Sequence, residues 1–214
     1  MVPIARRMLF TDRRRALLGV LGVAVALVMA LTLDGIFVGS TRQVSRYIDT
    51  SPADIFISQQ GVRTMHMSIS VIPAELLSEI RSISGVDWAE PIMLSSEALQ
   101  GSAGRRPTYV FGYQPGGHGG PQLLVEGEEP GPGELVADDA TATALGFGIG
   151  DQVEVLGRQW TVSGLTTGMT SIINTSVYLP FDELAAILGR PGTASYVLVG
   201  TEPGADVNSV ARQL

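Results

Sequence analysis

The chain has 214 residues, of which 45% are hydrophobic and only 16% charged, and its mean hydropathy is +0.26. This composition excludes a disordered chain, because it holds enough apolar material for a core, and the single long apolar run excludes a many-pass membrane protein within these residues. The lack of Cys and Lys excludes disulfide frameworks, thiolate metal sites, cysteine nucleophiles, Walker-type ATP loops and Schiff-base chemistry.

The charge is divided unevenly along the chain. Residues 1–33 contain five Arg and one Asp, whereas the remaining residues contain nine Arg and 20 acidic residues. The strongly acidic larger part argues against nucleic acid as its partner. A basic segment ahead of an apolar run is typical of a membrane protein whose N-terminus stays in the cytoplasm.

Residues 16–33 form an uncharged apolar run that resumes after Asp34 over residues 35–38. Because about 20 apolar residues span a bilayer, we predict a cytoplasmic basic segment over 1–15 and a transmembrane helix over 16–38. A cleaved signal peptide is the alternative, with a small-x-small site at Ala24-Val25-Ala26 or Val28-Met29-Ala30. The position of Asp34 near the outer end favours an interfacial role over a functional site.

A stalk and a β-α-β unit are predicted next. The helical spacing of Val44, Tyr47 and Ile48 extends the helix into a stalk over 39–52, which Pro52 ends. The predicted elements that follow are a strand over 54–58, a helix opened by Pro73 and ended by Gly85 with Leu76, Leu77, Ile80 and Ile83 on its apolar face, and strands over 86–94 and 107–113.

Short elements with many turn residues make up the rest of the chain. The predicted elements are a flexible loop over Gly112–Pro121, a strand over 134–137, a short helix capped by Asp138 or Asp139 and closed by Gly146, a hairpin of 152–156 and 159–165 about Gly157-Arg158, a strand over 177–179, a helix from Pro180 to Gly189, a strand over 195–199, and a C-terminal helix with Val207, Val210, Ala211 and Leu214 on one face.

The strand–helix pair of 54–83 recurs over 195–214, but no strand follows the second copy. The open apolar helix face and sheet edge that result predict that these residues are part of a longer protein.

No residue pattern predicts a catalytic, cofactor-binding or metal site. The Gly112–Pro121 loop lacks the following helix of a phosphate-binding loop. His66 with Met65 and Met67 would suit copper, but with His118 as the other histidine the ligands are too few. The adjacent pairs Asp138–Asp139 and Glu128–Glu129 are explained by helix capping and a solvated turn. The scattered aromatic residues are expected in the core: Tyr47, Phe56, Trp88, Tyr109, Phe111 and Trp160.

An ordered set of short motifs gives the chain a family resemblance. The set is Ile57-Ser58-Gln59-Gln60-Gly61, Ser84-Gly85-Val86 with Pro91, Gly133-Glu134-Leu135-Val136, Leu145-Gly146, Ile149-Gly150-Asp151-Gln152-Val153, Thr161-Val162-Ser163-Gly164-Leu165 and Val177-Tyr178-Leu179-Pro180. After a basic N-terminus and one spanning helix, this order resembles the MacB-like periplasmic core domain of FtsX-like ABC transporter permeases, over nearly the whole chain.

The resemblance implies an α+β extracytoplasmic domain of two βαβ, ferredoxin-like porter halves with a small β-rich subdomain inserted between them. The halves would be 53–120 and a truncated 181–214, with the insert at 121–180. In the family the domain lies between the first two of four spanning helices, and paired permeases work with a separate cytoplasmic ATPase.

The resemblance therefore implies a non-catalytic permease subunit, or its N-terminal part, in the plasma (inner) membrane, without a cofactor. Its implied partners are the ATPase, a second permease, membrane lipid and an extracytoplasmic protein or lipoprotein, with no nucleic acid. Two alternatives stay open: a single-pass adhesion or sensor module, and a secreted domain behind a cleaved signal peptide.

Overall fold

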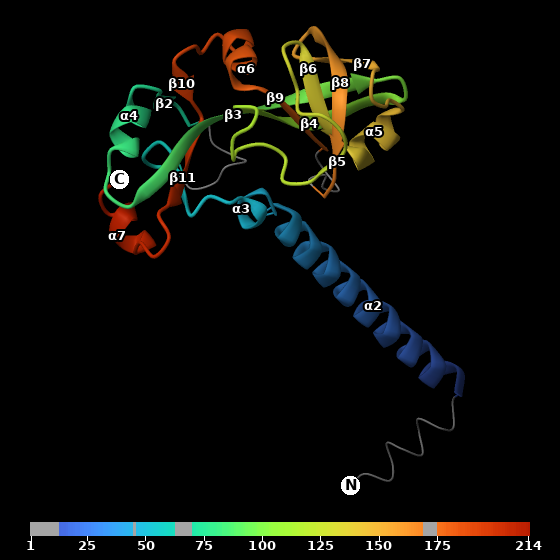
Figure 1. Ribbon diagram of the computed structural model, residues 1–214. Helices are drawn as coiled ribbons and strands as arrows, with labels where there is room; N and C mark the ends of the chain where they lie inside the picture. The colour runs from blue at the N-terminus through green and yellow to red at the C-terminus, as the bar shows by residue number, and fades with distance from the viewer. Residues whose placement is uncertain (1–12, 45, 63–69, 169–174) are drawn as a thin grey trace. The chain divides into compact units, whose positions relative to one another are not determined.

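The computed structural model describes residues 13–44, 46–62, 70–168 and 175–214. The chain divides into two compact units, residues 1–44 and residues 45–214. Figure 1 shows both, and each is described by itself below.

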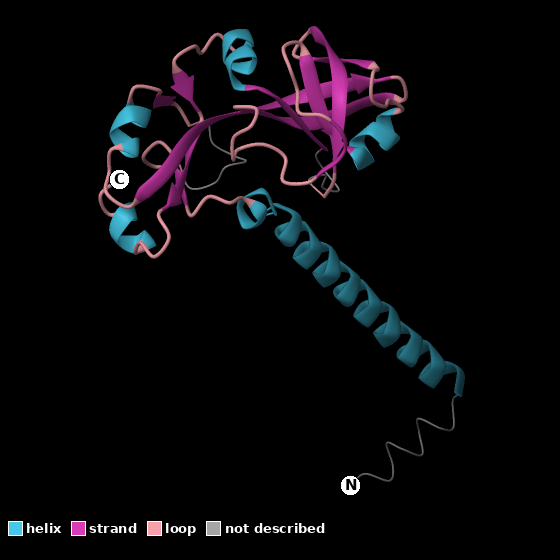
Figure 2. Cartoon of the chain, viewed as in Figure 1, coloured by secondary structure: helices cyan, strands magenta, loops and turns pink. Residues whose placement is uncertain are grey.

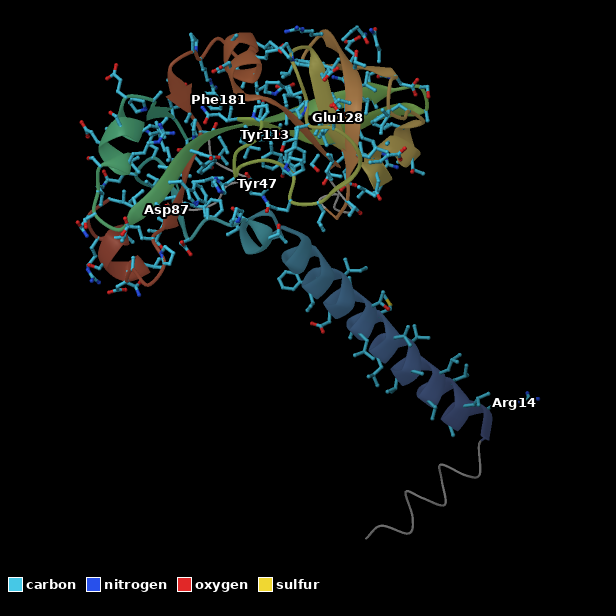
Figure 3. The ribbon with its side chains drawn as sticks, viewed as in Figure 1. Arg14, Tyr47, Asp87, Tyr113, Glu128 and Phe181 are labelled. Atoms are coloured by element: carbon cyan, nitrogen blue, oxygen red, sulfur yellow. The ribbon has the colours of Figure 1, made fainter. Side chains whose placement is uncertain are left out.

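The described part of the first unit is one long helix, α2 (Arg13–Val44). Residues Arg14–Gly39 form a 26-residue stretch that is long and apolar enough to cross a membrane, and none of it is buried within the protein. Figure 3 shows side chains around the whole helix, with Arg14 at its N-terminal end. A helix that is apolar on all sides fits a lipid surrounding, and Thr32 satisfies its hydroxyl by donating to the carbonyl of Val28 at 2.7 Å.

The second unit is built on a sheet of nine strands among the described residues (Figure 2). Their order is β1-β11-β3-β4-β9-β6-β8-β5, and β7 pairs with β3 and β8. The bounds are β1 (Ile55–Ile57), β3 (Val86–Gly101), β4 (Gly104–Tyr113), β5 (Leu124–Gly127), β6 (Glu134–Asp138), β7 (Gln152–Val155), β8 (Arg158–Thr166), β9 (Thr175–Pro180) and β11 (Tyr196–Thr201).

Strand β3 joins the two ends of this sheet. Its first part pairs with β11, up to Ile92 opposite Tyr196, and its second part pairs with β4, from Met93 opposite Gly112. The sequence predicted a strand over 86–94. Pairing with β4 extends it instead to Gly101, so a single strand ties both ends together.

At one end, β11 lies between β1 and β3 and pairs antiparallel with both. Helices α4 (Leu76–Arg81) and α7 (Val207–Ala211) flank this end, and Ile80 and Val210 bury their side chains in its core. The sequence predicted that Pro73 opens α4, and this is wrong. It lies in β2 (Ile72–Pro73), which pairs with β10 (Thr193–Ala194), so the helix begins three residues later.

Two helices bury fewer apolar side chains than the sequence predicted. In α4, the side chain of Leu76 is exposed. At the C-terminus, Val210 is buried, but Ala211 and Leu214 face solvent. Both helices are only one to two turns long, so each presents few side chains to the sheet.

The other end of the sheet confirms several local predictions. Helix α5 (Asp139–Leu145) is capped by Asp138, whose carboxylate accepts from the amide of Ala140, and it ends at Gly146 with φ of 70°. The β7–β8 turn is Leu156-Gly157, one residue earlier than predicted, with φ of 58° and 69°. Positive φ at both turn residues matches the twist of a two-residue hairpin.

Both faces of the central strands are buried. Val110 and Val177 point into one core, which α5 and α6 (Phe181–Ile187) cover through Leu145 and Leu184. The alternate residues Phe111 and Tyr178 point into a second core on the opposite face. That second core receives α3 (Arg46–Thr50), which follows α2 in the chain. Within the predicted stalk, residues 46–50 form α3.

Candidate functional site

The residues that the sequence singled out do not assemble into a catalytic or metal site. In the described residues, no three His, Cys, Asp or Glu side chains are grouped to hold a metal ion. The Met65-His66-Met67 segment lies outside the described residues. Asp138 caps α5, as predicted. Glu129 is not simply solvated, because its carboxylate accepts a hydrogen bond from the amide of Gly116 at 2.5 Å.

A stack of aromatic rings lies beneath α3. This aromatic cluster consists of Tyr47, Phe56, Phe111, Tyr113 and Tyr178. Tyr47 stacks on Phe111 at a centroid distance of 4.7 Å and meets the edge of Phe56 at 6.4 Å. Phe111 in turn stacks on Tyr178 at 5.3 Å. A continuous series of rings therefore runs from α3 to strands β4 and β9.

The Tyr47 side chain enters this core almost completely. Its exposed fraction is 6%, and its hydroxyl donates to the carbonyl of Gly119 at 3.0 Å. Figure 3 shows Tyr47 near Tyr113 at the sheet. Tyr47 is three residues beyond the end of α2, so it is the first described side chain after the long helix to be buried in the second unit.

Residues 114–121, which we call the clasped loop, lie against the same region. Glu90 on β3 contacts His118 through both carboxylate oxygens. One oxygen accepts a hydrogen bond from the His118 amide at 2.6 Å, and the other lies 2.9 Å from Nδ1. Since a carboxylate only accepts, Nδ1 carries the proton. The His118 ring also stacks on Trp88, with centroids 4.0 Å apart and planes 7° apart.

The clasped loop also depends on its glycines. A Cβ at Gly120 would overlap the ring of Tyr113, and a Cβ at Gly119 would lie 2.8 Å from Ile92. Both residues are buried. The composition predicted a flexible loop, and this is wrong, because Glu90, Trp88, Glu129 and Tyr47 fix the loop to the sheet.

Burial raises the pKa of the tyrosines in the aromatic cluster above the ordinary value of a phenol. Loss of solvent raises the pKa of Tyr47, and the negative charge of Glu90 raises it further. The pKa of Tyr113 is raised by burial and by Glu129. For Tyr178, burial raises the pKa well above its usual value, and Asp138 contributes to this. The cluster therefore presents neutral hydroxyls, which suit hydrogen bonding and packing better than proton transfer at neutral pH.

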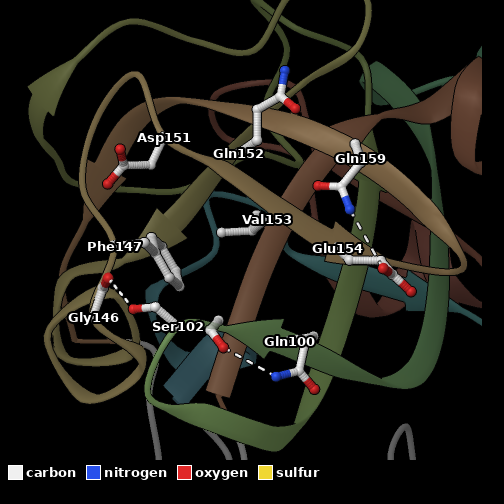
Figure 4. A pocket seen from close by; sticks show the side chains of 10 residues that line it. Gln100, Ser102, Gly146, Phe147, Asp151, Gln152, Val153, Glu154 and Gln159 are labelled. Carbon is white, nitrogen blue, oxygen red and sulfur yellow. Dashed lines mark hydrogen bonds between the residues drawn. The ribbon is translucent and has the colours of Figure 1, made fainter.

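A shallow polar pocket of about 390 Å³ lies at the far end of the sheet (Figure 4). Several of its polar side chains already form hydrogen bonds within the protein. Gln100 donates to the carbonyl of Gly101 at 3.0 Å, and Ser102 donates to that of Gly146 at 2.7 Å. Asp151 accepts from the amide of Gly148 at 2.8 Å. With these groups engaged, the pocket offers no set of free acid, base and nucleophile.

Comparison with known proteins identifies the family of this chain. The sequence profile of the MacB-like periplasmic core domain matches residues 16–214. The chain belongs to this family. It is therefore a domain of the type found in ABC-type transporter permeases, as the motif order implied. A search of curated proteins finds no match.

Solved structures agree with the family in fold. The periplasmic region of MacB from Actinobacillus actinomycetemcomitans is 13% identical, with a TM-score of 0.57 over 74% of this chain and 78% of that one. The extracellular domain of the noncanonic ABC-type transporter YknZ from Gram-positive bacteria is 17% identical, with a TM-score of 0.55 over 65% and 78%. At these identities, the similarity establishes the mixed α+β fold.

The predicted packing of Tyr47 in the core is confirmed by its burial, but sequence reasoning did not identify its partners. Its helical spacing with Val44 and Ile48 indicated an apolar face but not the partner of that face. The Glu90–His118 pair left no local signal either, because 28 residues separate the two.

Proposed function

We propose that the chain is a non-catalytic permease subunit of a bacterial ABC transporter, or a fragment of one. Helix α2 anchors it in the plasma membrane with the N-terminus in the cytoplasm, and residues 45–214 lie outside. A separate ATPase and a second permease copy complete the transporter. The family match and the apolar helix support this proposal, as do the basic residues ahead of the helix.

Within this proposal, residues 53–120 and 181–214 belong to two porter-like parts, and residues 121–180 form an inserted β-rich part. A partner or substrate outside the membrane would meet these parts. The described residues supply packing and hydrogen bonds rather than a catalytic group, which suits a domain that moves instead of one that reacts.

One observation supports the proposal most strongly: Tyr47, which follows the apolar helix in the chain, is buried in the core of the outer domain. Its ring stacks on Phe111, and its hydroxyl bonds Gly119. Close-packed interiors transmit displacement rather than absorb it. A displacement of α3 would therefore reach the clasped loop and the sheet through Tyr47.

Because the natural chain has no Cys, any single introduced cysteine is unique and can report topology. We expect Asp87→Cys, an exposed site on β3, to react with a membrane-impermeant maleimide in intact cells. Asp182→Cys, exposed on α6, serves as a second outer site. Arg6→Cys should react only after the cells are permeabilised.

The same experiment separates the alternatives. A mature protein that lacks the Arg6→Cys label in permeabilised cells and runs shorter would show a cleaved signal peptide. Protection of Asp87→Cys in intact cells would overturn the proposed orientation.

A fluorophore on Gln114→Cys tests the transmission of motion. In native membranes, addition of ATP should change its emission, and Tyr47→Ala should remove that change. An unchanged response in Tyr47→Ala would show that the motion takes another route. The absence of any response to ATP in the parent would contradict the permease assignment itself.

A further inference from the structure

Among the described residues of the second unit, the most exposed apolar surface lies on and beside strand β5. Leu123 and Val125 are 64% and 60% exposed, and Leu124 and the neighbouring Ile149 are 38% and 41% exposed. All four residues of β5 are exposed. We call residues 123–128 the β5 edge. Three consecutive exposed apolar residues are unusual on a folded surface and mark sites of interaction.

Strand β5 is also a free sheet edge. It is the last strand in the sheet order, and within the described ranges only β8 pairs with it. At the irregularity in this pairing, Val125 has no partner residue on β8. The outer side of such a strand presents unpaired amides and carbonyls that can accept another extended segment.

The charges along the β5 edge indicate which kind of extended segment could pair with it. Glu126 and Glu128 are exposed, and residues 121–129 contain no basic residue. Among the described residues, no ion pair involves either carboxylate. A second copy of β5 pairing antiparallel would bring these glutamates together, which is unfavourable. A different segment with Arg or Lys between its apolar residues would pair them.

We propose that the β5 edge is a docking strand for a separate extracytoplasmic protein, which adds an extended segment of alternating apolar and basic residues to the sheet. Backbone hydrogen bonds supply the pairing, Leu123 and Val125 supply the apolar contact, and Glu126 and Glu128 select the basic residues. The extracytoplasmic location of this partner rests on the orientation of α2 proposed above, whereas the strand pairing itself goes beyond the permease assignment and needs no ATPase.

The test uses the full chain in a neutral detergent and a fluorescent seven-residue peptide of alternating Val and Arg. Anisotropy measures binding. We expect binding at least about tenfold tighter than for the matching Val–Glu peptide, because each charge reversal across strands replaces an attraction by a repulsion. A Val–Arg peptide with N-methylated backbone amides on one edge should lose most of its affinity, since it cannot complete the ladder.

Two matched variants locate the site. Val125→Lys should weaken binding of the Val–Arg peptide at least about tenfold. Val71→Lys, which replaces another exposed Val outside β5, should leave it unchanged. Glu126→Gln should reduce the preference for the Val–Arg peptide over the Val–Glu peptide while sensitivity to N-methylation remains. An unaltered thermal midpoint in each variant shows that the fold is intact.

Three results would overturn the proposal. The first is equal binding of the Val–Arg and Val–Glu peptides, or none of either. The second is an equal loss of binding in Val71→Lys and Val125→Lys. The third is a concentration-dependent dimer of the parent that Val125→Lys abolishes, because the occupant of the β5 edge would then be a second copy. None of these results depends on the response to ATP, so failure here and failure of the permease assignment remain distinguishable.

Discussion

The clasped loop and the β5 edge are close in sequence and opposite in behaviour. The loop is rich in Gly and contains His118, yet Gly119 and Gly120 are buried and the loop is bonded to the sheet. The β5 edge begins with Leu-Leu-Val, yet its side chains are exposed. From composition alone, the Gly-rich loop would be expected to be exposed and the apolar β5 edge to be buried.

The difference comes from what faces each segment. The glycines let the loop backbone approach the Tyr113 ring and the Glu90 carboxylate, and no side chain of its own stands between them. The β5 edge ends the sheet, and within the described ranges no strand pairs with its outer side. In these two segments, burial therefore follows from what lies against each segment rather than from residue type, and substitutions can test that conclusion.

The largest expected effect is that of Tyr47→Ala, at the junction of α3 and the clasped loop. Removing a buried aromatic ring costs about 3–5 kcal/mol of unfolding free energy. The loss also leaves the carbonyl of Gly119 without its donor. Denaturant titration of the outer domain, followed by Trp fluorescence, measures it.

Tyr47→Phe is the matched control for that measurement. It keeps the stack on Phe111 but leaves the buried carbonyl of Gly119 without its donor, so the expected cost is about 1–3 kcal/mol. If Tyr47→Ala cost no more than Tyr47→Phe, the ring would not be holding α3 to the domain.

A smaller loss is expected for Gly120→Ala in the clasped loop. The new methyl group would overlap the Tyr113 ring, and overpacking of this kind costs about 1–3 kcal/mol. Gly148→Ala is the control, because no atom lies within 4 Å of its Cβ position. Comparison of their thermal midpoints tests whether the loop is fixed. Equal midpoints for the two variants would mean that the loop yields freely and that the contrast with the β5 edge does not hold.

The smallest effect is expected on the β5 edge itself. Leu123→Ala should change the unfolding free energy by less than about 0.5 kcal/mol, since the side chain is 64% exposed. The same substitution at Leu135, which is 0% exposed, should cost about 2–5 kcal/mol. A loss at Leu123 close to that at Leu135 would show that the β5 edge is covered, and the docking proposal would then lose its basis.

What the sequence by itself determined is local or continuous along the chain. The apolar run that forms α2, the Asp138 cap and Gly146 end of α5, and the ordered motifs of the family all depend on residues near one another. Helix length, capping and turn geometry follow from backbone rules over a few residues, so short patterns report them.

Only the tertiary structure decided the features on which the candidate site depends. Tyr47 meets Gly119 across 72 residues of sequence, and Glu90 meets His118 across 28. The extension of β3 to Gly101 and the placement of Pro73 in β2 likewise depend on partner strands. The physical reason is that strand pairing and ring stacking select partners by spatial proximity, which no local pattern encodes.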